Sequence, residues 1–111
     1  MKKFLVLYHA PSDAFEQMQK ATPEQQQAGM KAWMAWGDKA KSSIVDMGAP
    51  LGKGQKVTPA GASDKTNDLG GYSLMQAESK EALVKTLDGH PHFMMPDGWI
   101  EIVEVMPLPG M

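Results

Sequence analysis

The feature that most constrains the fold is a short apolar run near the start of the chain, residues 3–9 (KFLVLYH). Its residues have high strand propensity, and a proline two positions later ends it. Side chains alternate between the two faces of a strand, and here both sets are apolar: Phe4, Val6 and Tyr8 on one face, Leu5 and Leu7 on the other. A strand with two apolar faces must be covered on both, so we expect neither face of its sheet to be left in water.

A long helix is predicted after this strand. Thr22 serves as the cap, Pro23 takes the first helical position, and Gln25 follows three residues after the cap. Apolar residues then recur at helical spacing to about Asp46, and Gly48 suits a left-handed helix end. The pattern therefore predicts one helix from about residue 23 to residue 46.

The remaining segments alternate between strands, loops and one more helix. We expect a loop with one helical turn at 12–21, a Gly-interrupted edge strand at 49–58, a loop at 59–70, a strand at 71–77, a helix from the Ser79 cap to Asp88–Gly89, a turn at 90–98 and a strand at 99–106. The order β-α-β-β-α-β is typical of the ferredoxin-like fold. The predicted class is thus α+β, with a four-stranded antiparallel sheet.

Two helices can cover only one face of such a sheet. The other face carries about half of the strand side chains, several of them large and apolar, and an apolar patch of that size usually marks an interface. Two copies packed sheet to sheet around a twofold axis would form an α+β barrel, so we expect a homodimer through the sheet face. The 111 residues fit one domain, residues 1–111.

Composition excludes several classes of function. The formal net charge is −2 and the largest basic cluster is Lys2–Lys3, so no nucleic-acid partner is expected. The chain has no cysteine, which excludes a disulfide framework, a thiolate nucleophile and a sulfur-ligated metal. No segment approaches the roughly 20 apolar residues of a membrane span, and the opening run is too short for a signal peptide. We therefore expect no membrane partner and a cytoplasmic location.

The histidines are candidates for acid/base chemistry because histidine titrates near neutral pH. His9, at the end of the first strand, is either a general base at the mouth of the barrel or a strand-end residue bonded to a loop. His90 and His92 lie in the turn before the last strand. Their spacing could hold a metal with a third ligand such as His9, Asp97 or Glu101, but a plain capping turn accounts for it better, so no metal is expected.

The last predicted strand carries two carboxylates. Glu101 and Glu104 point to opposite faces, so at least one of them lies among apolar side chains. A carboxyl group in such surroundings has a raised pKa and can act as an acid or a base. The alternative is a glutamate in water at the sheet edge. We take His9, His90 and Glu101 as the candidate catalytic residues.

Several short motifs recur in a fixed order along nearly the whole chain. They are the opening KKFLVLYH, Trp33-x-x-Trp36, Gly48 followed by Pro50-Leu51-Gly52, Leu69-Gly70-Gly71-Tyr72, His90-Pro91 and Gly98-Trp99-Ile100-Glu101-Ile102. In these motifs the chain resembles the YCII-related family, in its longer branch named for a DGPF motif. The resemblance implies a dimeric α+β barrel.

The chain departs from that family in two places. Residues 63–68, SDKTND, stand where the DGPF motif is expected. A His–Asp pair is a proposed active site in the shorter branch, where one relative looks like a dehydrochlorinase, and its histidine lies on the first long helix. Positions 23–45 of this chain contain no histidine, so that chemistry is not carried over.

The function that these features favour is a small-molecule-binding dimer or a proton-transfer enzyme of lyase or isomerase type, without a cofactor. Its substrate would be a small organic ring, in a pocket between the long helix and the sheet. The candidate ligand-binding residues are Trp36, Tyr72, His92 and Asp97. The enzyme assignment rests largely on family analogy. A non-catalytic dimeric binding or interaction module remains the alternative.

Overall fold

The computed structural model describes residues 1–66 and 68–109. Its elements in chain order are the strand β1 (Lys2–His9), the helices α1 (Ser12–Gln19) and α2 (Pro23–Lys39), the 3-10 turn η1 (Lys41–Ser43), the strands β2 (Ile44–Pro50), β3 (Gly54–Thr58), β4 (Gly61–Lys65) and β5 (Leu69–Ala77), the helix α3 (Lys80–Thr86), the 3-10 turn η2 (Pro91–Met94) and the strand β6 (Trp99–Glu104). Asn67, in the stretch that replaces the DGPF motif, lies outside the described residues. Within the described ranges, no helix is both long and apolar enough to span a bilayer.

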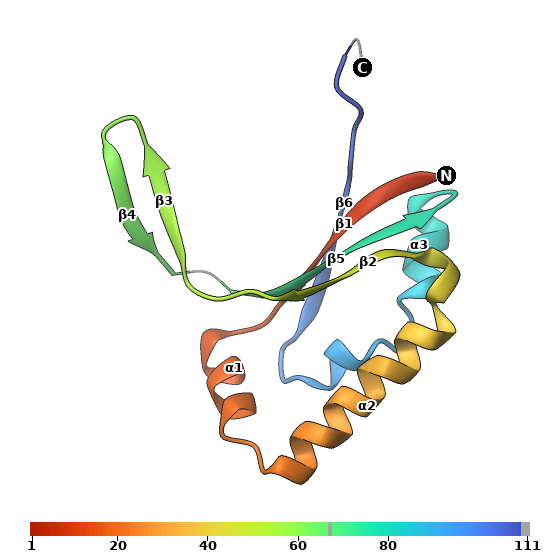
Figure 1. Cartoon of the computed structure of the whole chain (residues 1–111), viewed down its shortest axis with the longest axis horizontal. Helices are drawn as coiled ribbons and strands as arrows, with labels where there is room; N and C mark the ends of the chain where they lie inside the picture. Colours follow the sequence, from red (N-terminus) through yellow and green to blue (C-terminus); the bar gives the residue numbers. More distant parts are fainter. Residues whose placement is uncertain (67, 110–111) are drawn as a thin grey trace.

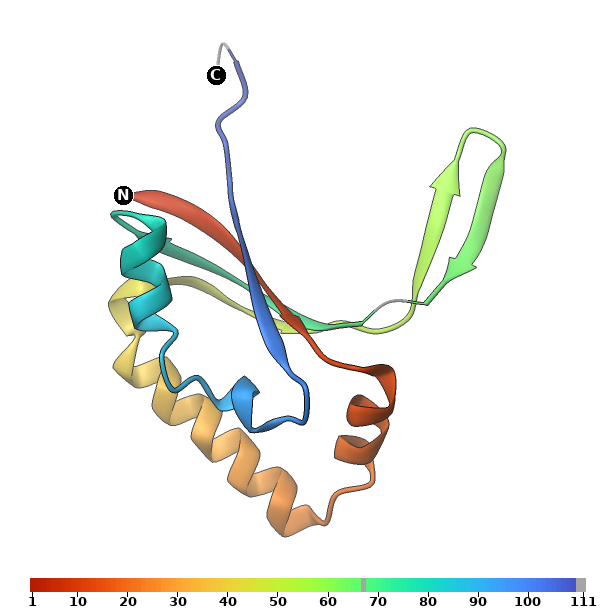
Figure 2. The same cartoon turned by 180° about the vertical axis from the view of Figure 1, so that it is seen from behind.

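Four strands form one antiparallel sheet in the order β2-β5-β1-β6. With α2 and α3 as the crossover helices, this order is the ferredoxin-like arrangement, and the predicted α+β fold class is confirmed. Figure 1 shows the helices gathered on one side of the sheet, and Figure 2 shows the same arrangement from behind. We call the side of the sheet away from α2 the open face.

The core lies between the sheet and the two crossover helices. Strand alternation turns Phe4 and Val6 toward the helices, and antiparallel pairing sets Met75 and Ser73 beside them. All four of these side chains are fully buried. The other buried members of the core come from β1, β5, α2, α3 and the ends of the two helices: Tyr8, Trp36, Ala40, Ala77, Leu83 and Leu87.

The helix start is as predicted, but the helix end is not. Thr22 and Gln25 form a reciprocal capping box, with Thr22 Oγ1 accepting from the Gln25 N–H at 3.2 Å. The helix α2 nevertheless ends at Lys39, and residues 44–50 form the edge strand β2. The prediction of a helix to residue 46 is therefore wrong. Ile44 pairs with Met75 of β5, which shows that pairing to the sheet prevails over the helical apolar spacing. Residues 12–19 form the helix α1, which is longer than the single helical turn predicted within a loop there.

A hairpin replaces the predicted edge strand and long loop between residues 49 and 70. Within the part of the chain that the structure describes, β3 and β4 pair only with each other, from Gly54 opposite Lys65 to Thr58 opposite Gly61. Figures 1 and 2 show this hairpin standing away from the body of the molecule, on the side of the sheet opposite α2. We call residues 54–65 the arm.

Candidate active site

The imidazole of His9 lies on the open face at the end of β1. Strand alternation puts it on the same face as Leu5 and Leu7, away from the helices. His9 pairs across the sheet with Trp99, the first residue of β6, and the two rings stack with centroids 4.0 Å apart and planes 8° apart. The stacked indole restricts the rotation of the imidazole, and His9 is only 8% exposed.

Both ring nitrogens of His9 are bonded to carboxylates. Nδ1 lies 2.8 Å from Asp68 Oδ1, and Nε2 lies 2.8 Å from Glu101 Oε1. Asp68 precedes β5 and is fixed by its carbonyl, which accepts the N–H of Ala10 at 2.9 Å. Glu101 extends from β6, opposite Leu7. We call His9, Asp68, Trp99 and Glu101 the His9 site.

The electrostatics of the His9 site favour a protonated imidazole. Partial burial lowers the pKa of His9, but the hydrogen bonds and charges of Asp68 and Glu101 together outweigh it, and the net shift is upward. The hydrogen bond from His9 in turn lowers the pKa of Asp68. The side chains of Asp68 and Glu101 are 49% and 44% exposed, so both carboxylates can still meet a ligand from the open face.

We expect His9 to titrate above the ordinary histidine value of 6.5. The replacement Asp68→Asn should lower the pKa of His9, because one of the two carboxylates that favour the imidazolium is lost. The measurement is an NMR titration of the imidazole protons. Glu104→Gln is the matched control, since Glu104 contacts Lys2 at 3.6 Å instead of His9. A wild-type pKa at or below 6.5 would contradict this assignment.

His90 and His92 lie on the other side of the sheet, in a buried aromatic cluster. The ring of His90 contacts those of Tyr8, Trp33 and Trp36, with centroids 4.2–5.0 Å apart. Its Nδ1 accepts the N–H of His92 at 2.9 Å. Burial, followed by the nearby His92, lowers the pKa of His90 to about 4, so its ring is neutral at pH 7.

The structure thus brings together two of the three candidate catalytic residues. His9 and Glu101 meet, but His90 does not join them, because His9 is on the open face and His90 packs against the helix-facing Tyr8. His92 reaches His9 only through the backbone, where its Nε2 lies 2.7 Å from the His9 carbonyl. The three candidate catalytic residues therefore do not share the predicted pocket between the long helix and the sheet.

The candidate ligand-binding residues also divide between the two faces. Trp36 is buried on α2, whereas Tyr72 is half-buried opposite Leu7, which places it on the open face. Asp97 is exposed in a turn with φ of 56°. Among the described residues, no group of three or more His, Asp or Glu side chains is arranged to hold a metal ion.

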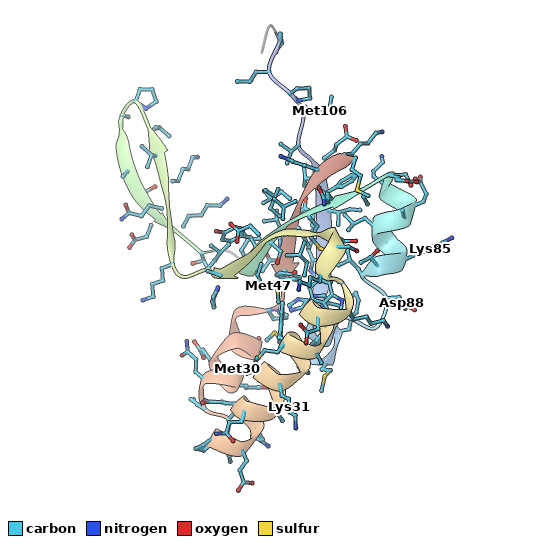
Figure 3. All side chains as sticks on the ribbon, turned by 45° about the vertical axis from the view of Figure 1, so that its right-hand side comes forward. Met30, Lys31, Met47, Lys85, Asp88 and Met106 are labelled. Atoms are coloured by element: carbon cyan, nitrogen blue, oxygen red, sulfur yellow. The ribbon has the colours of Figure 1, made fainter. Side chains whose placement is uncertain are left out.

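Two surface hollows lie on the helix side of the molecule. One, of about 320 Å³, is lined by Met34, Gly37 and Met47 among others, where β2 passes α2 (Figure 3). The other, of about 330 Å³, lies beside Trp36, Lys85 and Asp88. Neither contains a residue of the His9 site. The two carboxylates that bracket an imidazole, rather than these hollows, therefore mark the candidate site.

Sequence reasoning missed two residues of the His9 site, Asp68 and Trp99. The signal for Trp99 was present, because alternation along the last strand puts it on the same face as Glu101. Asp68 lies in a polar stretch whose composition predicts a loop. The available signal was its position directly before a strand, where a short acidic side chain can reach the end of the neighbouring strand.

No family model matches this sequence, and no curated protein matches it. Among solved structures, the chain is similar to the 5-chloro-2-hydroxyhydroquinone dehydrochlorinase of Burkholderia phenoliruptrix AC1100, determined in complex with 2,5-dihydroxybenzoquinone. The TM-score is 0.50 and the identity 17%, over 91% of each chain. At this identity the likeness supports the fold.

Proposed function

We propose that this chain is a small-molecule-binding homodimer that catalyses proton transfer, of lyase or isomerase type, on a small organic ring. The observation that carries the proposal is the bracketing of His9 by two carboxylates, each 2.8 Å from a ring nitrogen. A positioned imidazole whose pKa is raised toward working pH is a good general acid or base. The proposal includes membership of the YCII-related family, as one domain over residues 1–111.

The chemistry divides between the two carboxylates. Asp68 is anchored through its backbone and holds Nδ1, so it positions the ring. Glu101 and the Nε2–H of His9 share one hydrogen bond and form an adjacent base and acid. Glu101 removes a proton from the ring substrate, and the imidazolium stabilises the anion that forms and can return a proton elsewhere on it.

A second copy on the open face would enclose the His9 site. The apolar residues of this face are only partly covered in one chain: Leu5, Leu7, Tyr72, Leu74 and Val103. Packing two such faces removes apolar surface from water, at about 25 cal/mol per Å². It also excludes water from His9, which strengthens the electrostatic interactions on which the proposed chemistry depends.

The solved dehydrochlorinase suggests the class of ring to test, by analogy of fold. Its substrate and its bound ligand are oxygenated six-membered rings. Such rings form stabilised anions after loss of a proton. This suits a site in which a carboxylate can remove the proton and an adjacent imidazolium can stabilise the anion. We therefore choose 2,5-dihydroxybenzoquinone as the ligand probe and 5-chloro-2-hydroxyhydroquinone as the substrate probe.

We expect the wild-type protein to accelerate exchange of the ring protons of 2,5-dihydroxybenzoquinone in D₂O, measured by NMR, and to release chloride from 5-chloro-2-hydroxyhydroquinone. His9→Gln and Glu101→Gln should each lower these rates by about 100-fold or more. Glu104→Gln, on the same strand and bonded to Lys2, should leave them unchanged.

The alternative function predicts a different pattern. A non-catalytic binding module would bind the quinone with similar affinity in the wild type and in His9→Gln, and would show no exchange or chloride release. Failure of the wild-type protein both to bind and to exchange would reject the proposed substrate class. Equal rates in the wild type and in His9→Gln would reject His9 as the acid/base.

A further inference from the structure

The arm has little to stabilise it within one chain. Every residue from Gln55 to Thr66 is exposed, including Val57 at 76%. Among the described residues, its side-chain hydrogen bonds are internal: Gln55 Nε2 donates to Asp64 Oδ1 at 3.1 Å, and Thr58 Oγ1 donates to the Gly61 carbonyl at 3.4 Å. A lone two-stranded hairpin is marginally stable in water, so a surface that packs against the arm would add stability that the single chain does not provide.

The arm stands on the side of the sheet where we propose that a second copy packs. Figures 1 and 2 show it leaving the sheet on the open-face side, from the end where β5 begins. At this end His9 pairs with Leu69, the first residue of β5. Each of its strands has five residues, which corresponds to about 17 Å. Two packed sheets are separated by about 10 Å, so an arm of this length extends past the sheet of the second copy.

Symmetry then sets the arm beside a particular part of that copy. The sheet order is β2-β5-β1-β6, and the arm lies between β2 and β5 in the chain, near the β2 edge. In the proposed dimer the twofold axis is placed along the strands, between the two packed sheets, so that the β2 edge of one copy lies over the β6 edge of the other, at the same strand end. At that end, β6 carries Trp99 and Glu101 of the His9 site.

Charge complementarity favours the same contact. Pairing of Lys56 with Ser63, and of Lys65 with Gly54, places both lysines on one face of the arm. The His9 site carries the half-exposed carboxylates of Asp68 and Glu101. A basic face that approaches two carboxylates gains attraction, and it gives the site a positive charge to bind an anionic ring.

We propose that the arm of one copy docks on the second copy and completes its His9 site, with the face of Lys56 and Lys65 toward Asp68 and Glu101 of that copy. The inference rests on the homodimer of the proposed function. It adds that each site takes residues from both chains and that the substrate is anionic.

The test uses the absence of native cysteine. A nitroxide is attached to Val57→Cys in unlabelled protein, which is mixed with ¹⁵N-labelled protein that has no cysteine. Relaxation of the ¹⁵N-labelled copy by the nitroxide then reports contacts between chains only. We expect the amide signals around His9 and Glu101 to be lost. A nitroxide on Lys31→Cys, exposed on α2 (Figure 3), is the control and should leave them intact.

Three outcomes would overturn the inference: no broadening in the ¹⁵N-labelled copy, broadening away from the His9 site, or a monomer by sedimentation. Lys56→Glu should weaken the broadening from Val57→Cys, whereas Lys31→Glu should not; equal broadening in both variants would reject the role of the basic face. None of these measurements depends on turnover. The measurements can therefore show that the arm does not dock although the His9 site exchanges protons, and they can equally show that the arm docks although no exchange occurs.

Discussion

Replacing Gly48 with alanine is expected to lower the free energy of unfolding by at least about 3 kcal/mol. Gly48 lies in β2 with φ of 80°, a conformation that an alanine adopts only at a cost of about 1–2 kcal/mol. A Cβ at this position would also lie 2.6 Å from the carbonyl carbon of Tyr72 and 3.1 Å from Cα of Ser73. These are backbone atoms of β5, so β2 would have to move away from the strand that it pairs with.

Two further variants test this explanation for Gly48 by urea unfolding. Gly52→Ala is the matched control, because a Cβ there meets nothing within 4 Å, and it should change stability by less than about 1 kcal/mol. Gly48→Asn separates the two causes, since asparagine tolerates a positive φ but still carries a Cβ. We expect it to destabilise nearly as much as alanine. An asparagine variant as stable as the wild type would show that backbone conformation, rather than the approach of β5, is the constraint.

Gly48 also shows why part of the fold could not be predicted from the sequence. A glycine after an apolar helical stripe suggests a helix end, and its positive φ agrees with that, but the element around it is a strand. The strand β2 has register shifts between Ile44 and Asp46 and between Asp46 and Ala49, so its side chains do not alternate regularly. The strand β6 keeps an unbroken register with β1, and β1 and β5 keep theirs up to a shift between Tyr8 and His9, so their strand-forming sequences coincide with regular pairing.

The arm could not be predicted from the sequence for a different reason. Only Val57 and Thr58 in its first strand favour β structure, and its second strand, GASDK, has the composition of a loop. Backbone pairing rather than side-chain burial forms this hairpin, so hydrophobic periodicity carries no signal for it. If the arm docks on a second copy, the residues that stabilise it lie on the surface of another molecule.

The His9 site could have been predicted further than it was. Odd-numbered residues of β1 share one face, so His9 belongs with Leu5 and Leu7, and Glu101 belongs with Trp99 and Val103. That alternation groups these residues by face, but because both faces of β1 are apolar it does not say which face the helices cover. Alternation also does not identify the partner strand, and it is pairing with β6 that sets His9 opposite Trp99 and within reach of Glu101.

The buried aromatic cluster leads to the second large effect, a loss of stability on acidification. His90 is 1% exposed, and within the described residues its Nε2 has no hydrogen-bond partner, as is also true of Trp36 Nε1. Its Nδ1 is the acceptor for the His92 N–H and must be unprotonated for that bond to form. Protonation of the ring would therefore place a charge among aromatic side chains and remove a cap of η2 at the same time.

The sign of the effect follows from the lowered pKa of His90, about 4 in the folded chain against 6.5 ordinarily. As pH falls below 6.5 the unfolded chain takes up this proton and the folded chain does not, so unfolding is favoured at about 1.4 kcal/mol per pH unit. The raised pKa of His9 has its effect at higher pH. The stability that it contributes is complete below pH 6.5 and is lost as pH rises through the pKa of His9 in the folded chain. The lowered pKa of Asp68 removes stability only below its ordinary value of 3.8.

Between pH 6.5 and 4 we therefore expect the free energy of unfolding to fall by about 3 kcal/mol, nearly all of it from His90. Urea unfolding at intervals of half a pH unit measures this. His90→Asn keeps an acceptor for the His92 N–H but does not titrate, so it should be less stable at pH 7 and yet lose the slope. His9→Gln, which removes the other shifted imidazole, should retain the slope. If His90→Asn keeps the wild-type slope, a different group carries the acid sensitivity and the neutral buried state of His90 is wrong.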